Sequence, residues 1–256
     1  MKNTELVSII IVNWNGLRWL PDCFNSLAVR KLLLMDQPDR LDAIGAFLTR
    51  TGFLYHYGFH TKNTKSLDKE IELYTVKGAC MIFRRNVLRK ICVEGKLFDP
   101  LYFAYFEETD ICHRIWLAGY RIMYIPSSVI YHKAGGTSSA MNNTFIQYHS
   151  FKNRIQSYLT NLDFSSLLII LPTHILLTTG YTLAAFFRGK IKLGFAIIRA
   201  MVWNIWYWRV TLDKRRFVNK YIRKVSDLSL FPHIIRSPGY SYFLKLAKGL
   251  SLYQHE

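Results

Sequence analysis

Residues 102–122, YFAYFEETDICHRIWLAGYRI, set the local structure of the central part of this chain. An aromatic run is followed by three carboxylates within four positions, Glu107, Glu108 and Asp110, and then by apolar residues at helical spacing. We predict a helix that begins at the carboxylates and ends at Gly119, because glycine readily adopts the left-handed conformation that closes a helix. Two strands are predicted to follow, over 120–126 and 127–132.

The segments before this helix also alternate between strand and helix. Residues 71–85 are predicted to form one or two strands broken at Gly78, and residues 86–91 a short helix. Near the N-terminus, LVSIIIVN (6–13) is a continuous β-branched apolar run, typical of a buried parallel strand. Apolar residues at helical spacing follow over 17–27, and KLLLM (31–35) is another apolar run, whereas 41–70 carries few periodic signals. This order predicts an α/β fold with a partly parallel sheet over residues 1–150.

The sequence changes character after residue 150. Residues 164–187 contain no Asp, Glu, Lys or Arg and are long enough to cross a bilayer, although Pro172 and His174 argue against a simple span. A buried core helix is the alternative. Residues 191–212 combine basic residues with a Trp/Tyr cluster at 203–208, which is typical of a helix at the membrane interface. We therefore expect a membrane-associated helical tail over 151–256.

The positive charge of the chain is concentrated in the same tail. The formal net charge is +17, of which residues 151–256 carry +12. The basic residues are interleaved with apolar runs and no nucleic-acid-binding motif is present, so we expect anionic lipid head groups as the partner and no nucleic acid. The four cysteines follow no metal-binding spacing, which favours reduced thiols. Together these features predict a location at the cell membrane, with the α/β domain on the cytoplasmic side.

The acidic cluster has a structural and a catalytic interpretation. Carboxylates in a first helical turn are favoured by the helix dipole, and Asp110 stands four residues before Arg114, the spacing of a helix-stabilising pair. For Asp110 we favour this structural role, although it is kept with Glu107 and Glu108 as a candidate catalytic residue. The adjacent pair Glu107 and Glu108 follows aromatic residues, and two like charges in an apolar setting raise a carboxyl pKa toward the range of a general base.

Several segments, taken in order, resemble the family 2 glycosyltransferases, particularly their rhamnosyltransferase-like branch. The segments are VSIIIVNWNG, VKGACMIFRRNVL, GKLFDPLYFAYFEETDICHRIWLAGYRI and IPSSVIYHKAGGTS, within residues 5–30 and 70–140. The resemblance implies the GT-A fold and inverting transfer of a sugar from a nucleotide-sugar donor to a glycan or lipid-linked acceptor. It implies that Glu108 is the base that takes the proton of the acceptor hydroxyl, and that Glu107 orients the acceptor.

The resemblance also assigns binding roles to other positions. Donor binding is implied for Val12, Asn13 and Asn15, which match the loop that holds the nucleotide base. Acceptor binding is implied for a loop at Gly78 and Ala79, with Arg114 as a further candidate. A divalent cation, Mg²⁺ or Mn²⁺, is implied as cofactor, with His132 as one ligand, whereas a lone histidine at the end of a strand is more often structural.

One part of the family pattern is missing. NSLAVR runs directly into KLLLMDQPDR, where family members carry a block with DxD-type acids that hold the metal. Asp36 and Asp39 are the acids nearby, and their proline-containing context is typical of a turn. We therefore expect a GT-A domain shortened by an internal deletion. Three hypotheses remain: a shortened glycosyltransferase, a non-catalytic module that acts beside a complete glycosyltransferase, and a membrane-anchored structural protein whose acids only cap a helix.

Overall fold

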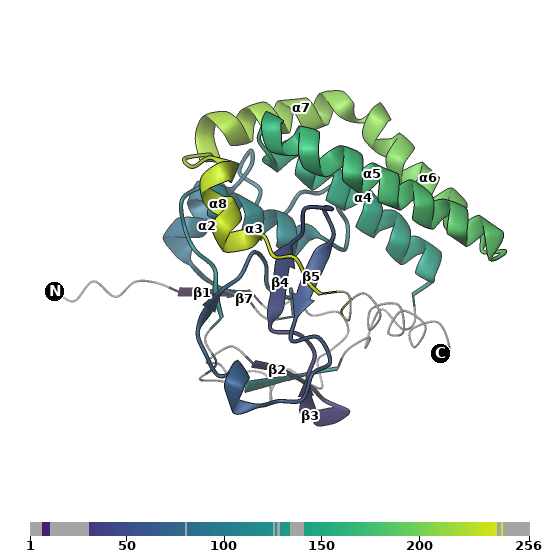
Figure 1. Cartoon of the computed structure of the whole chain (residues 1–256). Helices are drawn as coiled ribbons and strands as arrows, with labels where there is room; N and C mark the ends of the chain where they lie inside the picture. Colours follow the sequence, from purple (N-terminus) through teal and green to yellow (C-terminus); the bar gives the residue numbers. More distant parts are fainter. Residues whose placement is uncertain are drawn as a thin grey trace.

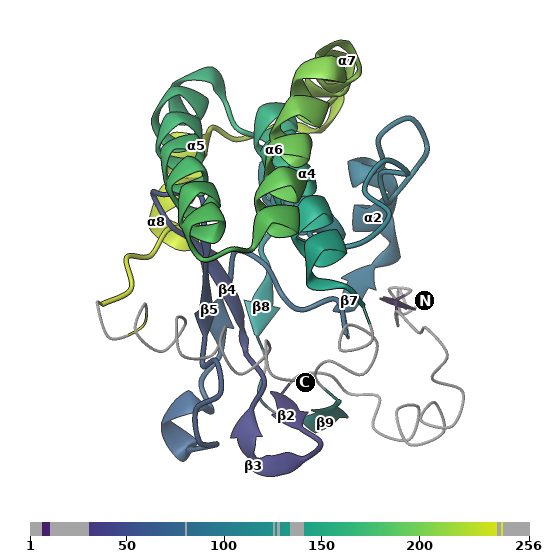
Figure 2. The same ribbon diagram turned by 90° about the vertical axis from the view of Figure 1, so that its right-hand side faces the viewer.

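The chain folds into a β-rich part and a group of helices packed along one side of it (Figures 1 and 2). The computed structural model describes residues 7–10, 31–79, 81–124, 126, 129–133, 141–239 and 242. The predicted donor-binding residues Val12, Asn13 and Asn15 lie outside these ranges. The described part is therefore mixed α/β, as the sequence predicts.

The described strands form four small sheets in place of one continuous sheet. Strand β2 (Lys31–Leu34) lies between β3 (Gln37–Leu41), antiparallel to it, and β9 (Val129–His132), parallel to it. The other sheets are antiparallel pairs: β1 (Val7–Ile10) with β7 (Met81–Arg84), β4 (Gly45–Leu48) with β5 (Leu54–Tyr57), and β6 (Ile71–Glu72) with β8 (Met123–Tyr124). Parallel pairing is therefore seen at β2 and β9, whereas the prediction of a parallel strand at 6–13 is wrong for its described part, β1, which is antiparallel to β7.

The region 41–70 contains two strands and a short 3₁₀ helix that its weak periodicity did not reveal. All of β4 is buried, so its residues do not alternate, and β5 is partly buried throughout. At Gly45 an added Cβ would lie 2.7 Å from the backbone oxygen of Thr75, so only glycine allows this close approach. The 3₁₀ helix, η2 (Lys65–Leu67), lies in the connection to β6.

The predicted central helix is confirmed as α3 (Glu107–Leu117), and Gly119 has the left-handed φ of 82° that ends it. Most of α3 is buried, and the indole Nε1 of Trp116 donates to the carbonyl oxygen of Leu73, 3.0 Å away. The predicted short helix before it is α2 (Arg85–Ile91). These two helices link the strands to the helical layer.

The helical layer is built around α4 (Asn143–Asn161), against which α5 (Phe164–Phe187) and α6 (Ile191–Trp206) pack as a hairpin (Figure 2). Side chains of Asn142 and Asp163 accept backbone N–H groups at the starts of α4 and α5. The chain returns through α7 (Trp208–Phe217), a π-helical turn, η4 (Val218–Ile222), and α8 (Asp227–Ile234). The second apolar run therefore forms two helices in place of one.

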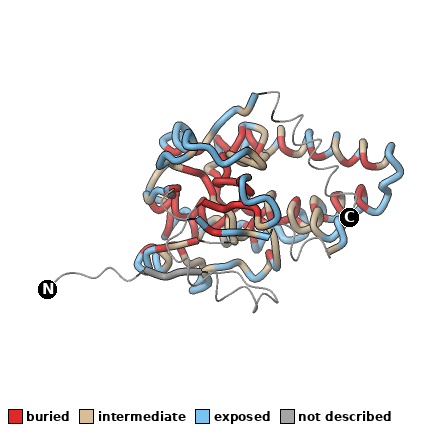
Figure 3. Tube along the Cα trace, turned by 90° about the horizontal axis from the view of Figure 1, so that it is seen from below, coloured by how far each residue is buried: buried red, intermediate tan, exposed pale blue. Residues whose placement is uncertain are grey.

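One core joins the two regions that the sequence analysis separates at residue 150. That boundary falls inside α4, and Tyr158, Leu162 and Ile170 belong to the same buried cluster as Ile111 and Trp116 of α3. In Figure 3 the buried residues run from the β-rich part into the helices, while the far ends of the hairpin are exposed. The first helices of the tail are thus part of the fold that holds the acidic cluster.

Helix α5 is long and apolar enough to cross a membrane, the one such helix among the described residues. One of its faces nevertheless contacts the β-rich part: His174 is fully buried, its Nδ1 lies 3.2 Å from the carbonyl oxygen of Thr51, and its ring lies 4.5 Å from that of Phe53. Length and composition alone are weak evidence for a span, because a core helix of a soluble protein passes the same test.

Candidate functional site

The loop that leads into α3 has an unusual backbone. Phe103, Tyr105 and Phe106 all have positive φ, at 63°, 68° and 73°. Bulky L-residues rarely adopt this conformation, and it persists only where surrounding contacts impose it. Because Phe106 is the residue that precedes the first turn, this backbone sets the direction in which Glu107 and Glu108 project.

Helix α4 supplies the contacts that impose this backbone. The fully buried Asn153 donates through Nδ2 to the carbonyl oxygens of Tyr102, Ala104 and Tyr105, at 3.0, 2.8 and 2.6 Å. Lys152 donates to the carbonyl oxygen of Leu101. Sequence analysis did not find Asn153, because nothing in the pattern of residues shows that α4 crosses this loop.

The acidic pair lies at the edge of the core, partly buried, and does not project into bulk solvent. Burial raises the pKa of Glu107, and one of its oxygens, Oε2, is buried without a hydrogen-bond partner among the described residues. Burial, followed by the charge of Glu107, raises the pKa of Glu108 to about 7, against a smaller lowering effect of Lys77. A carboxyl group that titrates near neutral pH can accept a proton from a hydroxyl group during a reaction.

Of the two loop residues that the sequence analysis expects to bind the acceptor, Gly78 lies beside Glu108. A Cβ built on Gly78 would lie 3.7 Å from Cβ of Glu108, so the backbone of Gly78 directly faces this side chain. Ala79 lies one residue further on, packed against Leu32 and Ile130 of β2 and β9. The juxtaposition of Gly78 and Glu108 is therefore a feature of the fold.

Asp110 and Arg114 have only internal contacts. Their ion pair is 3.0 Å long and both side chains are buried, with Arg114 also donating to the carbonyl oxygens of Ile91 and Leu97. The remaining oxygen of Asp110 accepts from three buried donors, the side chains of Tyr102, Ser157 and Asn161. These contacts support the structural interpretation of the pair, so neither residue is given a role in the chemistry proposed below.

A second polar cluster lies where β2, β9 and the loop before β7 meet. Asp42 is fully buried, and its two carboxylate oxygens lie 2.8 Å from Lys77 Nζ and 2.8 Å from His132 Nδ1. Burial by itself would raise the pKa of Asp42, but the hydrogen bond with His132 and the ammonium of Lys77 lower it below its usual 3.8. Sequence analysis missed Asp42, whose one visible signal is that it is a lone acid inside the apolar run 41–48.

This cluster does not provide a site for the expected divalent cation. Both oxygens of Asp42 are engaged by Lys77 and His132, and no group of three or more His, Cys, Asp or Glu that could hold a metal occurs in the part of the chain the structure describes. Asp36 and Asp39 are exposed; Asp36 lies in the predicted turn between β2 and β3, whereas Asp39 lies in β3. The described residues thus do not fit the cation, since Mg²⁺ and Mn²⁺ need several oxygen ligands.

His56, on β5, lies close enough to Lys77, Arg154 and Asp42 for their charges to act on its imidazole. Burial, and then the charges of Lys77 and Arg154, lower its pKa to about 4, so its imidazole is neutral at physiological pH. Because Lys77 also acts on Glu108, these side chains share one region of the molecule. That region therefore contains a carboxyl group with a raised pKa, the neutral imidazole of His56, and the cations of Lys77 and Arg154.

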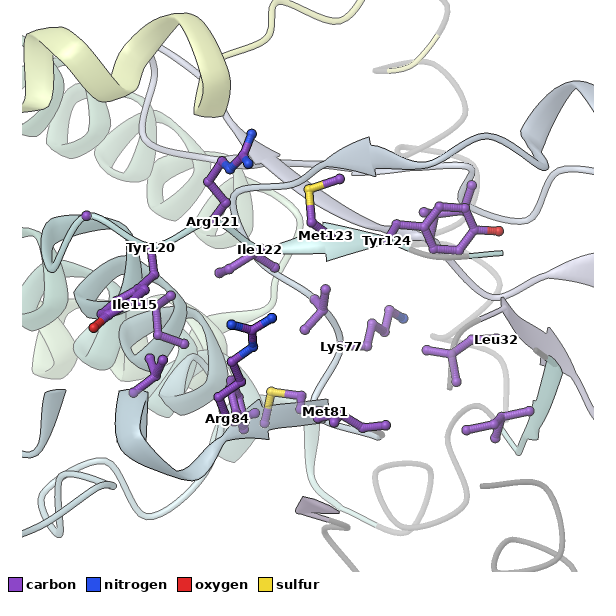
Figure 4. Close-up of a pocket in the computed structure, with 17 residues that line it drawn as sticks. Leu32, Lys77, Met81, Arg84, Ile115, Tyr120, Arg121, Ile122, Met123 and Tyr124 are labelled. Atoms are coloured by element: carbon purple, nitrogen blue, oxygen red, sulfur yellow. The ribbon is translucent and has the colours of Figure 1, made fainter. Parts of the chain in front are cut away.

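One cavity among the described residues lies next to this region, with Lys77 in its lining. Its volume is about 590 Å³, and it separates β7 and β8 from β2, with Met81, Tyr124 and Leu32 on its walls (Figure 4). Its lining is mostly apolar and includes Lys77, Arg84 and Arg121, but neither Glu107 nor Glu108. This cavity contains no carboxylate, whereas the acidic pair has carboxyl groups with raised pKa values, so we place the candidate chemistry at the acidic pair.

Comparison with known proteins gives a partial similarity. Two curated relatives are N-acetylglucosaminyl-diphospho-decaprenol L-rhamnosyltransferases of Mycobacterium tuberculosis, strains CDC 1551 / Oshkosh and ATCC 25618 / H37Rv. Each is 38% identical to this chain over 63 residues, which are 24% of this chain and 19% of the relative. The match thus spans about a fifth of the length of these relatives. No family model and no solved structure matches the chain.

Proposed function

We propose that this chain is a glycosyltransferase that transfers a sugar, with inversion, from a nucleotide-sugar donor to a glycan or lipid-linked acceptor. The observation that carries the proposal is the Glu108 carboxyl, partly buried at the start of α3 with a pKa of about 7. The partial similarity to rhamnosyltransferases that act on a lipid diphosphate supports the same reaction class.

In the proposed reaction Glu108 acts as the general base. Its carboxylate takes the proton of an acceptor hydroxyl while that oxygen attacks the anomeric carbon, and the bond from this carbon to the nucleoside diphosphate breaks. Glu107, also with a raised pKa, orients the acceptor, and Gly78 leaves space beside Glu108. No step is assigned to a divalent cation, because the described residues do not fit one.

The GT-A fold and the internal deletion belong to the same proposal. The parallel pairing of β2 with β9 is compatible with a Rossmann-like sheet, and the division of the described strands into four small sheets is compatible with a deletion. The mostly apolar cavity between β7, β8 and β2 is compatible with strands absent from this place. The missing block would thus weaken donor binding more than acceptor binding.

We place the chain at the cytoplasmic face of the cell membrane. Support comes from α5, which is apolar enough to enter a bilayer, and from exposed aromatic side chains at the junction of α6 and α7, including Trp206 and Trp208. Aromatic residues of this kind favour the membrane–water interface. The exposed basic residues between α5 and α6, Arg188 and Lys192, add attraction to anionic head groups.

A transfer assay with a matched control tests the proposed function. The full-length chain in membranes is given radiolabelled UDP- or dTDP-sugars and N-acetylglucosaminyl-diphospho-decaprenol, the acceptor of the relatives, and labelled lipid is measured. We expect transfer by the wild type, loss of at least about 100-fold in Glu108→Gln, and full activity in Glu70→Gln, whose side chain is exposed. Full activity of Glu108→Gln would contradict the assignment of the base.

A second candidate is a non-catalytic module that binds the acceptor beside a complete glycosyltransferase. The observation that favours it is the lack of a fitting metal-ligand set among the described residues. Calorimetry separates the two candidates: a glycosyltransferase binds a UDP- or dTDP-sugar in the presence of Mn²⁺, whereas the module does not. The module would instead raise transfer by the complete enzyme when both are added.

A further inference from the structure

Arg154, on α4, has fewer polar partners than the other arginines that the described fold buries fully or partly. Arg114, Arg215 and Arg223 donate to backbone carbonyl oxygens, and Arg114 and Arg223 also pair with carboxylates. Arg154 forms no ion pair with any carboxylate among the described residues, and its buried Nε has no acceptor there. Its Nη2 makes a single long contact, 3.4 Å, with Ser150 Oγ.

Three aromatic rings surround the guanidinium in place of acceptors. Its central carbon lies 5.1 Å from the ring centre of Phe53, 5.4 Å from that of Phe106 and 5.5 Å from that of Phe151. We call these three rings the Arg154 cage. Rings at such distances attract a cation and hold its plane, but they accept none of its N–H groups in the way an oxygen does.

A buried guanidinium without an anion is energetically unfavourable. Burial lowers the pKa of Arg154, which shows that the charged form loses hydration here. In proteins such cations are normally paired, and a planar guanidinium matches the oxygens of a phosphate group through two parallel hydrogen bonds. The residue as a whole is partly exposed, and Nε is the one guanidinium nitrogen among the fully buried atoms without a partner in the described part of the chain.

The position of the cage points to the kind of anion. Phe106 directly precedes Glu107 and Glu108, so one wall of the cage adjoins the proposed catalytic pair. Phe151 and Phe53 belong to a second apolar cluster that joins α4 to the α5–α6 hairpin through Ala185, Leu193 and Ile197. The cage therefore lies between the acidic pair and an apolar helical surface, which exposes large side chains such as Leu176, Leu183 and Phe195.

We propose that Arg154 binds a phosphate group of a prenyl diphosphate whose hydrocarbon chain lies against the α5–α6 hairpin. This inference rests on the proposed function, because it names the lipid part of the acceptor for the same site. The phosphate supplies the negative charge that the three rings of the Arg154 cage do not provide, and the hydrocarbon chain packs against the apolar side chains of the hairpin. A sugar on the diphosphate would then extend toward Glu108.

Binding measurements that need no sugar transfer test this site. Calorimetry on the full-length chain in detergent uses geranyl diphosphate, with geraniol, inorganic pyrophosphate and UDP as comparison probes. Arg154→Met is compared with Arg216→Met, a change at an arginine whose side chain is 77% exposed. We expect geranyl diphosphate to bind about 10-fold to 100-fold more weakly to Arg154→Met, the loss of a bidentate charged contact, and normally to Arg216→Met.

The comparison probes identify the source of the phosphate. Geraniol and pyrophosphate should each bind more weakly than geranyl diphosphate, and UDP binding should not depend on Arg154. Equal binding of geranyl diphosphate to wild type and Arg154→Met overturns the proposal. Loss of UDP binding alone in that variant also overturns it, since the anion would then belong to the nucleotide donor.

Thermal unfolding separates a binding role from a structural one. An arginine held for an anion should be dispensable for folding, so Arg154→Met should melt no lower than wild type in the absence of ligand. If it does not fold, Arg154→Lys serves as the second variant, and unfolding of both overturns the proposal. Because none of these measurements requires transfer, an inactive chain that still binds geranyl diphosphate through Arg154 would refute the proposed function alone.

Discussion

Glu108 shows how one side chain acquires its properties from its neighbours. In the sequence it is one of three acids ahead of a helix, and the helix dipole alone would keep all three ionised. In the fold Asp110 is neutralised by Arg114, while Glu107 and Glu108 are left together in partly dehydrated positions. The local chemistry is thus divided between a structural acid and a pair with raised pKa values.

The pKa of Glu108 leads to a prediction about pH. Proton acceptance requires the ionised form, so transfer should rise through an apparent pKa of about 7 and level off above it. Since the folded-state pKa exceeds the usual 4.5, the unfolded chain releases this proton first as pH rises. The free energy of unfolding should therefore fall between about pH 4.5 and 7, and Glu108→Gln should remove this part of the dependence.

Rates and urea unfolding curves measured from pH 5 to 9 check both effects. Glu70→Gln is the control, because its exposed side chain should leave both profiles unchanged. A transfer rate that is flat across pH 7 would argue against Glu108 as the base.

Asp42 carries a second prediction at the scale of single residues. Its replacement by asparagine leaves Lys77 and His132, whose side chains are 29% and 32% exposed, without the buried carboxylate that they share, and losing hydrogen bonds to a charged group costs about 2 kcal/mol. Denaturant unfolding measures the loss. Asp213→Asn removes an ion pair whose two side chains are 77% and 66% exposed, and should change stability by no more than about 0.5 kcal/mol. Equal effects of the two changes would mean that the Asp42 cluster is not a buried pair.

At the scale of elements, α4 positions the acidic pair. Its central residues contact the loop 101–106 on one side and the α5–α6 hairpin on the other. Without those contacts the positive φ values of the loop would relax, since bulky residues adopt them only under constraint. The geometry at Glu107 and Glu108 therefore depends on a helix that begins after the α/β segments have ended.

Asn153 is the residue in which this dependence can be measured. Asn153→Ala removes a donor to three backbone carbonyl oxygens, and we expect a loss of about 2 to 3 kcal/mol of stability, together with lower transfer, because the loop no longer fixes α3. Asn143→Ala, an exposed position on the same helix, is the control. A variant at 153 with normal activity would show that the loop keeps its backbone by other means.

At the scale of the whole molecule, the helices combine two tasks. One side of the layer closes the core beside α3, and the other exposes large apolar residues, of which Phe187 at the end of α5 is 90% exposed. Cations at 188, 190 and 192 lie at the turn between α5 and α6. A surface with apolar, aromatic and basic groups is typical of a protein that enters one side of a bilayer.

Vesicle binding tests this surface. The double variant Phe187→Ser with Trp206→Ser should bind vesicles of phosphatidylcholine and phosphatidylglycerol at least about tenfold more weakly, because each aromatic ring buries a large apolar area. Binding should also weaken with salt, since the charges act through water. Tyr131→Ser, on β9, removes an exposed aromatic residue away from the helices and should bind like wild type. Equal binding of all three proteins would exclude insertion through the hairpin.

Local pattern was sufficient for much of the secondary structure. The helix at Glu107–Leu117 with its end at Gly119, the break at Gly78, the turn at Asp36 and the long apolar helix at Phe164–Phe187 follow from spacing and turn residues. These features depend on interactions within a few residues, which a sequence displays directly. The sequence pattern did not predict β4. All of its residues are buried, so apolar and polar residues do not alternate along it.

The candidate site required the tertiary structure. The sequence by itself determined that adjacent acids open a helix and that Asp110 is spaced to pair with Arg114. Only the folded chain decided that Asp42 is buried between Lys77 and His132, that Asn153 holds the loop before the acids, and that Arg154 lies among three rings. These contacts join residues far apart in the chain, and a pKa or a strained backbone depends on burial and distance, which are properties of the packed molecule.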